Sequence, residues 1–225
     1  MEESVWDFLS PLHEGDAEAA IPATPVSFDG FFELDESLIS GAGRQGPMVL
    51  PWPVLGNPSG FLTFSDTSQW REFCVGLGLR FQIPYIVAAK LRRAQKLYFL
   101  GWLDFDFIKA GELMALATLE LALRDRYGDK VKDRRGRMSF AALLKYVLVD
   151  GLTDDKVPML QRCGGTIVGL LNGDRVPSLA QIRNRQAHGD PFDGLPVSGL
   201  LELVRDLVEY AYRDWASFAP VPYFS

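Results

Sequence analysis

The sequence has 225 residues, of which 48% are hydrophobic and 23% are charged, a composition typical of globular proteins and not of disordered chains. Two cysteines and two histidines are too few for a disulfide framework or a histidine-rich metal centre. The net charge is −6, but residues 1–40 contain ten acidic residues and no lysine or arginine, which leaves 19 acidic against 23 basic residues elsewhere. We therefore expect an acidic leader before a mildly basic body; the leader is either a solubilising tail or a segment that covers a basic surface.

The start of the chain, MEESVWDFLSPLHEGD, is acidic and lacks the basic and apolar regions of a signal peptide. The longest uncharged stretch, from Gln45 to Ser65, contains four prolines and three glycines, so we do not expect it to form a membrane helix. These observations predict a cytoplasmic protein with no membrane partner.

The distribution of proline divides the chain. Seven of the 14 prolines precede residue 60, and none occurs between Tyr85 and Val157. In the first part, MVLPWPV and GFLTF flank GNPSG, which predicts a β-hairpin with proline on an edge strand. From Pro84 onward apolar residues recur at helical spacing. We predict helices over residues 84–102, 104–128, 139–150 with Ser139 as N-cap, 157–173 with a break at two glycines, 178–188 and 200–218.

Short loops join these helices, so the sequence predicts an all-α antiparallel bundle over residues 81–225. An acidic leader over residues 1–40 and a loop and hairpin extension over residues 41–80 precede it. The extension carries the small β element.

Two patterns are interpreted as structural. The stretch GAGRQG at residues 41–46 satisfies GxGxxG, but the residues that follow, PMVLPWP, cannot open a phosphate-binding helix, so we interpret it as a loop. The cysteines and histidines, Cys74, Cys163, His13 and His188, are isolated from one another in the sequence. We therefore expect neither a metal site nor a cofactor.

Two acidic residues share one predicted helix. Glu112 and Glu120 are eight residues apart, which places them about 80° apart around the helix axis. Either one carboxylate faces a pocket or both belong to a solvated helix face.

The connection from Arg124 to Arg137 is strongly basic, with seven basic and three acidic residues. Arg134, Arg135 and Arg137 are its candidate RNA-binding residues, since such a loop can follow a phosphate backbone. An ordinary solvated turn is the alternative interpretation.

The short helix over residues 178–188 ends in RNRQAH, which places Arg183, Asn184 and His188 together. Asn184 and His188 are four residues apart and share a helix face. The negative end of the helix dipole favours a protonated imidazole, and an arginine fork can hold a phosphate. These residue types suit phosphodiester cleavage by proton transfer, while capping of a helix C-terminus is the structural alternative.

This motif, with the long helical run LYFLGWLDFDFIKAGELMALATLELALRDRYG before it and an amphipathic helix after it, resembles the HEPN superfamily. The resemblance covers residues 84–218. It implies a HEPN-like bundle, a homodimer with a composite site, and a metal-independent endoribonuclease, often a toxin or defence effector with a protein inhibitor or regulator. His188 is then the general base or acid, Arg183 holds the scissile phosphate of the RNA, and Asn184 orients the histidine or the phosphate.

One position departs from the family pattern. The tyrosine that follows the histidine by two residues in members silenced by nucleotidylation is replaced here by Asp190, so that form of control is not expected. The alternative function is a non-catalytic HEPN-like helical module that binds a protein or a nucleotide. If the acidic leader restrains the basic body, deletion of residues 1–40 will tighten RNA binding at low salt, and an unchanged affinity will refute the idea.

Overall fold

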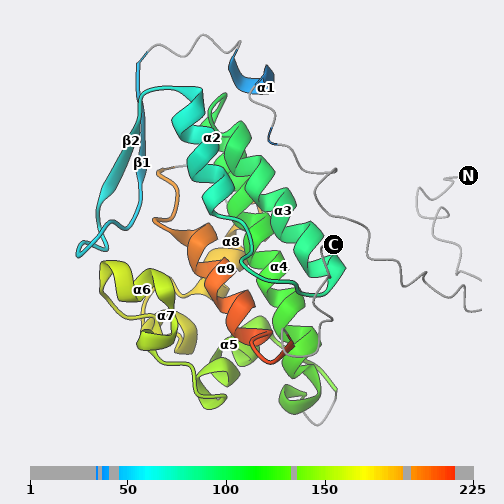
Figure 1. Cartoon of the computed structure of the whole chain (residues 1–225). Coiled ribbons are helices and arrows are strands. Elements are labelled where there is room, and N and C mark those ends of the chain that lie inside the picture. The colour runs from blue at the N-terminus through cyan, green and yellow to red at the C-terminus, as the bar shows by residue number, and fades with distance from the viewer. Residues whose placement is uncertain (1–33, 35–36, 41–45, 133–135, 190–193, 216–225) are drawn as a thin grey trace, which may run out of the picture. The chain divides into compact units, whose positions relative to one another are not determined.

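The computed structural model describes residues 34, 37–40, 46–132, 136–189 and 194–215, all within a unit that runs from Leu34 to Ser225. This part of the chain is mostly helical and contains one small antiparallel sheet (Figure 1). The expected mainly helical class and its small β element are thereby confirmed. The elements in chain order are α1 (Ser37–Ser40), β1 (Met48–Pro51), β2 (Phe61–Phe64), α2 (Thr67–Gly76), α3 (Tyr85–Leu100), α4 (Phe105–Val131), α5 (Phe140–Val149), the 3-10 helix η2 (Asp154–Lys156), α6 (Pro158–Cys163), α7 (Val168–Asn172), α8 (Leu179–Ala187) and α9 (Leu200–Ala211).

The predicted hairpin is present. β1 and β2 pair in antiparallel fashion, with Met48 opposite Phe64 and Pro51 opposite Phe61. Met48 is fully buried whereas Val49 is exposed, because successive side chains of a strand point to opposite faces of the sheet. The hairpin therefore covers the helices with one face and leaves the other face outside.

The sequence analysis did not predict α2, which lies between the hairpin and α3. Asp66 caps its first turn by accepting a hydrogen bond from the backbone N–H of Gln69 at 2.9 Å. Trp70 is fully buried, and its indole N–H donates to the backbone oxygen of Phe99 at the end of α3 (2.8 Å). The extension is thus attached to the helices by a helix of its own.

The centre of the fold is the antiparallel pair of long helices α3 and α4, which lie side by side in Figure 1. They approach closely at Gly111, where an added Cβ would lie 2.7 Å from the Tyr98 ring and 3.1 Å from the backbone oxygen of Ala94. A larger residue there would push the two helices apart.

α9 packs along α4 and is buried over nearly its whole length. It carries buried charges that are paired: Asp206 and Glu209 both bind the guanidinium of Arg80, and Asp206 also accepts the backbone N–H of Met159 at 2.8 Å. These pairings satisfy groups that would otherwise be costly to remove from water.

The prediction of a helix over residues 200–218 was too long, because α9 ends at Ala211; residues 216–218 lie outside the described part. Tyr212 follows as the C-cap, remains fully buried, and donates its hydroxyl to Asp125 on α4 at 2.7 Å. Burial of Tyr212 continues the apolar pattern past the point where the helical backbone stops. In the part of the chain that the structure describes, every helix is too short or too polar to cross a membrane.

Candidate functional site

The candidate site lies on α8, which packs against α4 and α5. A capping box starts this helix: Ser178 accepts from the backbone N–H of Gln181 (3.3 Å), and the Gln181 side chain accepts from the backbone N–H of Ser178 (2.9 Å). Leu179 and Ile182 are buried against the helices below. The polar half of α8, from residue 183 onward, is left at the surface.

The structure brings Arg183 and Asn184 together and adds a partner from α4. Arg183 donates from Nη1 to the side-chain oxygen of Asn184 (3.1 Å) and pairs through Nη2 with Glu120 (2.5 Å). The same carboxylate accepts from Arg124 at 3.0 Å. Glu120 therefore lies between two guanidinium groups and fixes the orientation of Arg183.

His188 stands apart from this cluster. It is the C-cap of α8, where its backbone N–H donates to the oxygens of Asn184 (3.0 Å) and Arg185 (3.1 Å). Its side chain is exposed, and within the described residues the imidazole makes no hydrogen bond. Within one copy of the chain, His188 and Arg183 therefore belong to the same helix, but their side chains do not contact each other through a hydrogen bond.

A second glutamate reaches α8 from α4. Glu112 is fully buried and accepts from the side chain of Gln186 (3.2 Å) and from the backbone N–H of Val197, while the Lys109 ammonium lies 3.6 Å away. Burial raises the pKa of Glu112 from 4.5 to about 7, although the charge of Lys109 and the two donors oppose that rise. The side-chain oxygen of Gln186 is buried without a hydrogen-bond partner.

Both glutamates therefore face α8. Neither alternative of the sequence analysis describes them, because Glu112 is buried among hydrogen-bond partners and Glu120 is ion-paired and only 13% exposed. The sequence analysis considered each residue but did not connect either of them with the helix that ends in His188. A signal was present, since two residues about 80° apart on one helix can face the same neighbour.

Of the candidate RNA-binding residues, Arg134 and Arg135 lie outside the described residues. Arg137 is described and exposed. Two other basic residues of this stretch make internal contacts that the sequence analysis missed: Arg124 binds Glu120, and Arg126 donates to the backbone oxygen of Ala211 at the end of α9 (2.9 Å). Part of the positive charge is therefore used to hold helices together.

The remaining patterns behave as follows. Residues 41–45 of the GxGxxG stretch lie outside the described part, and Gly46 leads into the strand β1 rather than into a helix. Cys74 and Cys163 are buried, free thiols. Among the described residues, no three histidine, cysteine, aspartate or glutamate side chains are grouped as a metal site would require.

Comparison of the chain with protein-family models, with curated proteins and with solved structures finds no match.

Proposed function

We propose that this protein is a metal-independent endoribonuclease with a HEPN-like helical bundle, and that Arg183, Asn184 and His188 form its site. The observation that carries the proposal is the cluster at the exposed end of α8. There Glu120 holds Arg183, Arg183 contacts Asn184, and the imidazole of His188 faces solvent little more than one turn further along the helix. An oriented cation and a free imidazole at a surface are the groups that metal-free phosphodiester cleavage requires.

In the proposed reaction, the imidazole of His188 accepts the proton of a ribose 2′-hydroxyl. The 2′-oxygen attacks phosphorus and the bond from phosphorus to the 5′-oxygen breaks, which leaves a 2′,3′-cyclic phosphate. The guanidinium of Arg183 stabilises the charge that develops on the phosphate oxygens. The leaving 5′-oxygen takes its proton from a protonated imidazole.

The same geometry supports a homodimer as the active form. A single imidazole cannot be base and acid in the same step, and the His188 side chain of one copy is not hydrogen-bonded to its own Arg183. Two copies of α8 facing each other would supply both histidines and would enclose a scissile phosphate that one exposed helix leaves open.

A second function has an observation of its own. The guanidinium of Arg183 already has two partners, Glu120 and Asn184, which compete with a phosphate for its donors. This favours the alternative, a non-catalytic helical module that binds a protein or a nucleotide through the end of α8.

Cleavage of RNA in the presence of EDTA tests the proposal. We compare the wild type with His188→Ala and use His13→Ala as the matched control, because it removes the other histidine of the chain. We expect the wild type and His13→Ala to cut RNA and to leave a 2′,3′-cyclic phosphate. Cleavage by His188→Ala should be slower by about two orders of magnitude or more.

Equal cleavage by His188→Ala would refute the site. If neither the wild type nor His188→Ala cuts RNA although both are folded and dimeric, the helical binding module becomes the better assignment.

A further inference from the structure

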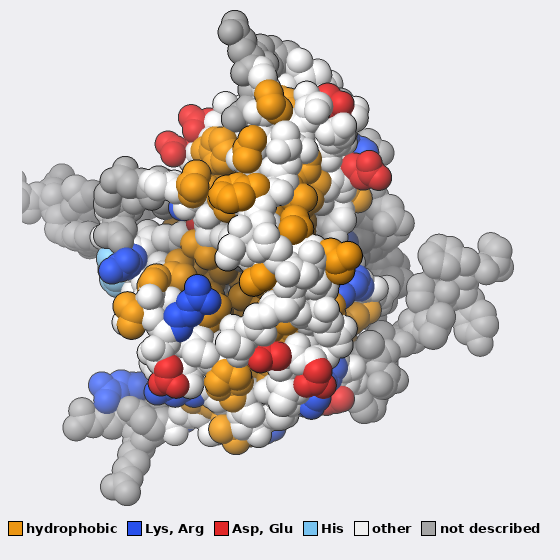
Figure 2. Space-filling model, turned by 90° about the vertical axis from the view of Figure 1, so that its left-hand side faces the viewer, with side chains coloured by type: hydrophobic (Ala, Val, Ile, Leu, Met, Phe, Trp, Pro, Cys, Tyr) orange, Lys and Arg blue, Asp and Glu red, His pale blue; other side chains and the backbone are white. Residues whose placement is uncertain are grey.

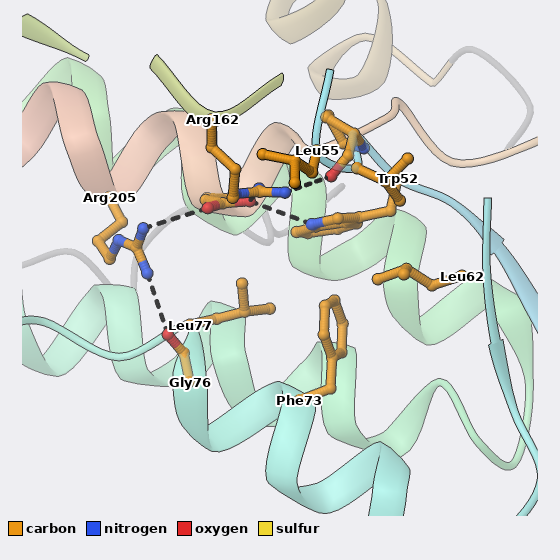
Figure 3. Close-up of a pocket in the computed structure, with 11 residues that line it drawn as sticks. Trp52, Leu55, Leu62, Phe73, Gly76, Leu77, Arg162 and Arg205 are labelled. Atoms are coloured by element: carbon orange, nitrogen blue, oxygen red, sulfur yellow. Dashed lines mark hydrogen bonds and ion pairs between the residues drawn. The ribbon is translucent and has the colours of Figure 1, made fainter. Parts of the chain in front are cut away.

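A cavity of about 470 Å³ opens beside the hairpin, and its lining includes no residue of α8 (Figure 3). The chain after β1 forms one wall, the C-terminal part of α2 forms the opposite wall, and α6 and α9 contribute its polar end. Its size lies within the range of small-molecule sites in proteins, about 300 to 1,000 Å³. Nothing in the proposed ribonuclease reaction uses it.

The walls of the cavity are apolar. Trp52 and Phe73 face each other as an edge-to-face pair with ring centroids 4.9 Å apart, and Leu62 and Leu77 extend this surface on either side of Phe73 (Figure 3). Exposed Leu55 belongs to the rim of the cavity. Figure 2 shows hydrophobic side chains gathered on the upper part of the face that lies on the left-hand side of Figure 1. Such walls favour an apolar, preferably aromatic, ligand body.

The polar end is built around Glu202. Its carboxylate accepts from Arg162 at 2.6 Å and from the indole N–H of Trp52 at 3.1 Å, and Arg205 lies 3.5 Å away. Arg205 also donates to the backbone oxygen of Gly76 (3.0 Å), and it pairs with Asp206 (3.0 Å). The donors of Arg205 are therefore nearly all used within the protein.

Arg162 differs from Arg205 because it keeps unused donors at the mouth of the cavity. It donates once to Glu202 and once to the backbone oxygen of Pro53 (2.7 Å), and within the described residues its other N–H groups make no hydrogen bond. Its side chain is 37% exposed, against 7% for Arg205. An arginine has five N–H donors and no acceptor, so a ligand group that meets Arg162 must accept hydrogen bonds.

We propose that this cavity binds a small amphipathic organic anion. The aromatic or branched apolar body lies against the wall formed by Phe73 and Leu62, beside the edge-to-face contact of Phe73 with Trp52, and a carboxylate or comparable anionic group takes the free donors of Arg162. This site is separate from the α8 cluster, and the proposal stands whether or not the protein cleaves RNA.

Calorimetric titration with naphthylacetate tests the proposal, and naphthylethanol serves as its neutral counterpart with the same ring system. We expect the carboxylate to bind at least about tenfold more tightly than the alcohol, because a charge-assisted hydrogen bond to arginine is lost in the alcohol. Arg162→Met should remove this difference and leave the affinity for the alcohol unchanged. Arg93→Met is the matched control, since it removes an exposed arginine from the surface of α3.

A second variant tests the location without removing a contact. Gly76 lines the cavity, and a Cβ added there meets no atom within 4 Å. Gly76→Leu should therefore fold and, by narrowing the cavity, weaken both ligands by about tenfold or more. Three results would each overturn the proposal: equal affinities of the two ligands for the wild type, no binding up to about 10 mM, or binding that neither variant changes.

Discussion

Glu112 and Glu120 are the same residue type on the same helix, and both reach α8, yet they are in opposite physical situations. Glu112 is fully buried among Gln186, Val197 and Lys109, whereas the side chain of Glu120 is 13% exposed and is paired with an arginine that also faces solvent. Eight residues along α4 therefore separate a buried polar cluster from a surface ion pair.

The difference shows that burial decides whether a carboxylate contributes to stability or orients a neighbouring side chain. At Glu112 the protein has removed a charge from water, so the side chain has a raised pKa and supports the fold. At Glu120 solvent screens the interaction, so little stability depends on it, and its consequence is the orientation of Arg183. The comparison predicts that changes at position 112 act on stability and that changes at position 120 act on the proposed site.

The largest effect is expected from Glu112→Ala. The substitution removes the counter-charge of the buried Lys109 ammonium, which keeps only the backbone oxygen of Leu195, and leaves the Val197 N–H without its acceptor. The free energy of unfolding should fall by about 3 to 5 kcal/mol. Urea denaturation measures it. Glu120→Ala is the matched control and should cost about 1 kcal/mol or less; equal losses at the two positions would contradict the comparison.

The next largest effect is expected in the pH dependence of stability, to which the carboxyl group of Glu112 should contribute. Its pKa is higher in the folded state than in the unfolded chain, so its favourable contribution is complete below about pH 4.5, is lost as the pH rises toward 7, and stays lost above. A shift of this size corresponds to about 3 kcal/mol. Two charged or titratable neighbours face the carboxyl group: Lys109, which lowers its pKa, and Tyr98 on α3, whose own pKa burial and Glu112 both raise.

The measurement is the difference in unfolding free energy between wild type and Glu112→Gln from pH 4.5 to 8. The variant cannot titrate at this position, so subtraction cancels other groups such as Asp150, whose pKa is lowered. We expect the unfolding free energy of Glu112→Gln to rise relative to that of the wild type as the pH rises. A difference that does not change with pH would mean that the carboxyl group is not held at a raised pKa.

Glu120→Gln should produce a smaller change, and mainly in activity. The weaker hold on Arg183 should slow the proposed RNA cleavage about tenfold, or 1.4 kcal/mol, with a change in stability below about 1 kcal/mol. A double-mutant cycle tests whether the effect passes through the arginine: in an Arg183→Ala background, Glu120→Gln should slow cleavage no further. Additive losses would show that Glu120 acts in another way.

The smallest effect is expected from Arg124→Met, which removes the other guanidinium from Glu120. This pair spans one helical turn and the arginine is 49% exposed, so the expected cost is about 0.3 to 0.5 kcal/mol. Thermal denaturation at low and high salt measures it, since salt should reduce the difference between variant and wild type. A loss above 1 kcal/mol would place the Glu120 pair among the interactions that hold the fold.

Local signals explain what the sequence could predict of this fold. Ser139 and Ser178 each cap the helix that follows them, because a cap depends on residues only three positions away. The hairpin was predicted for the same reason. By contrast, α2 was missed although Asp66 caps it, since the nearby prolines and glycines favoured loops and strands.

The contacts of the candidate site depend on packing between distant segments and were not predictable. Arg183 and Glu120 are 63 residues apart, and only the relative position of α4 and α8 decides that they meet. The same holds for Arg126, which was grouped with a basic loop by sequence and in fact binds the end of α9. Charge along a sequence does not tell which arginines are already engaged inside the fold.

The bond between Trp52 and Glu202 joins residues that are 150 positions apart. On a ribosome that adds about 5 to 20 residues per second, the hairpin would wait roughly 8 to 30 s after its synthesis before α9 emerges to receive it. During that interval the indole of Trp52, which is buried in the folded protein, lacks the hydrogen-bond acceptor that α9 supplies. Nascent chains of this protein are therefore expected to need a chaperone's protection at the hairpin until the last helix has left the ribosome.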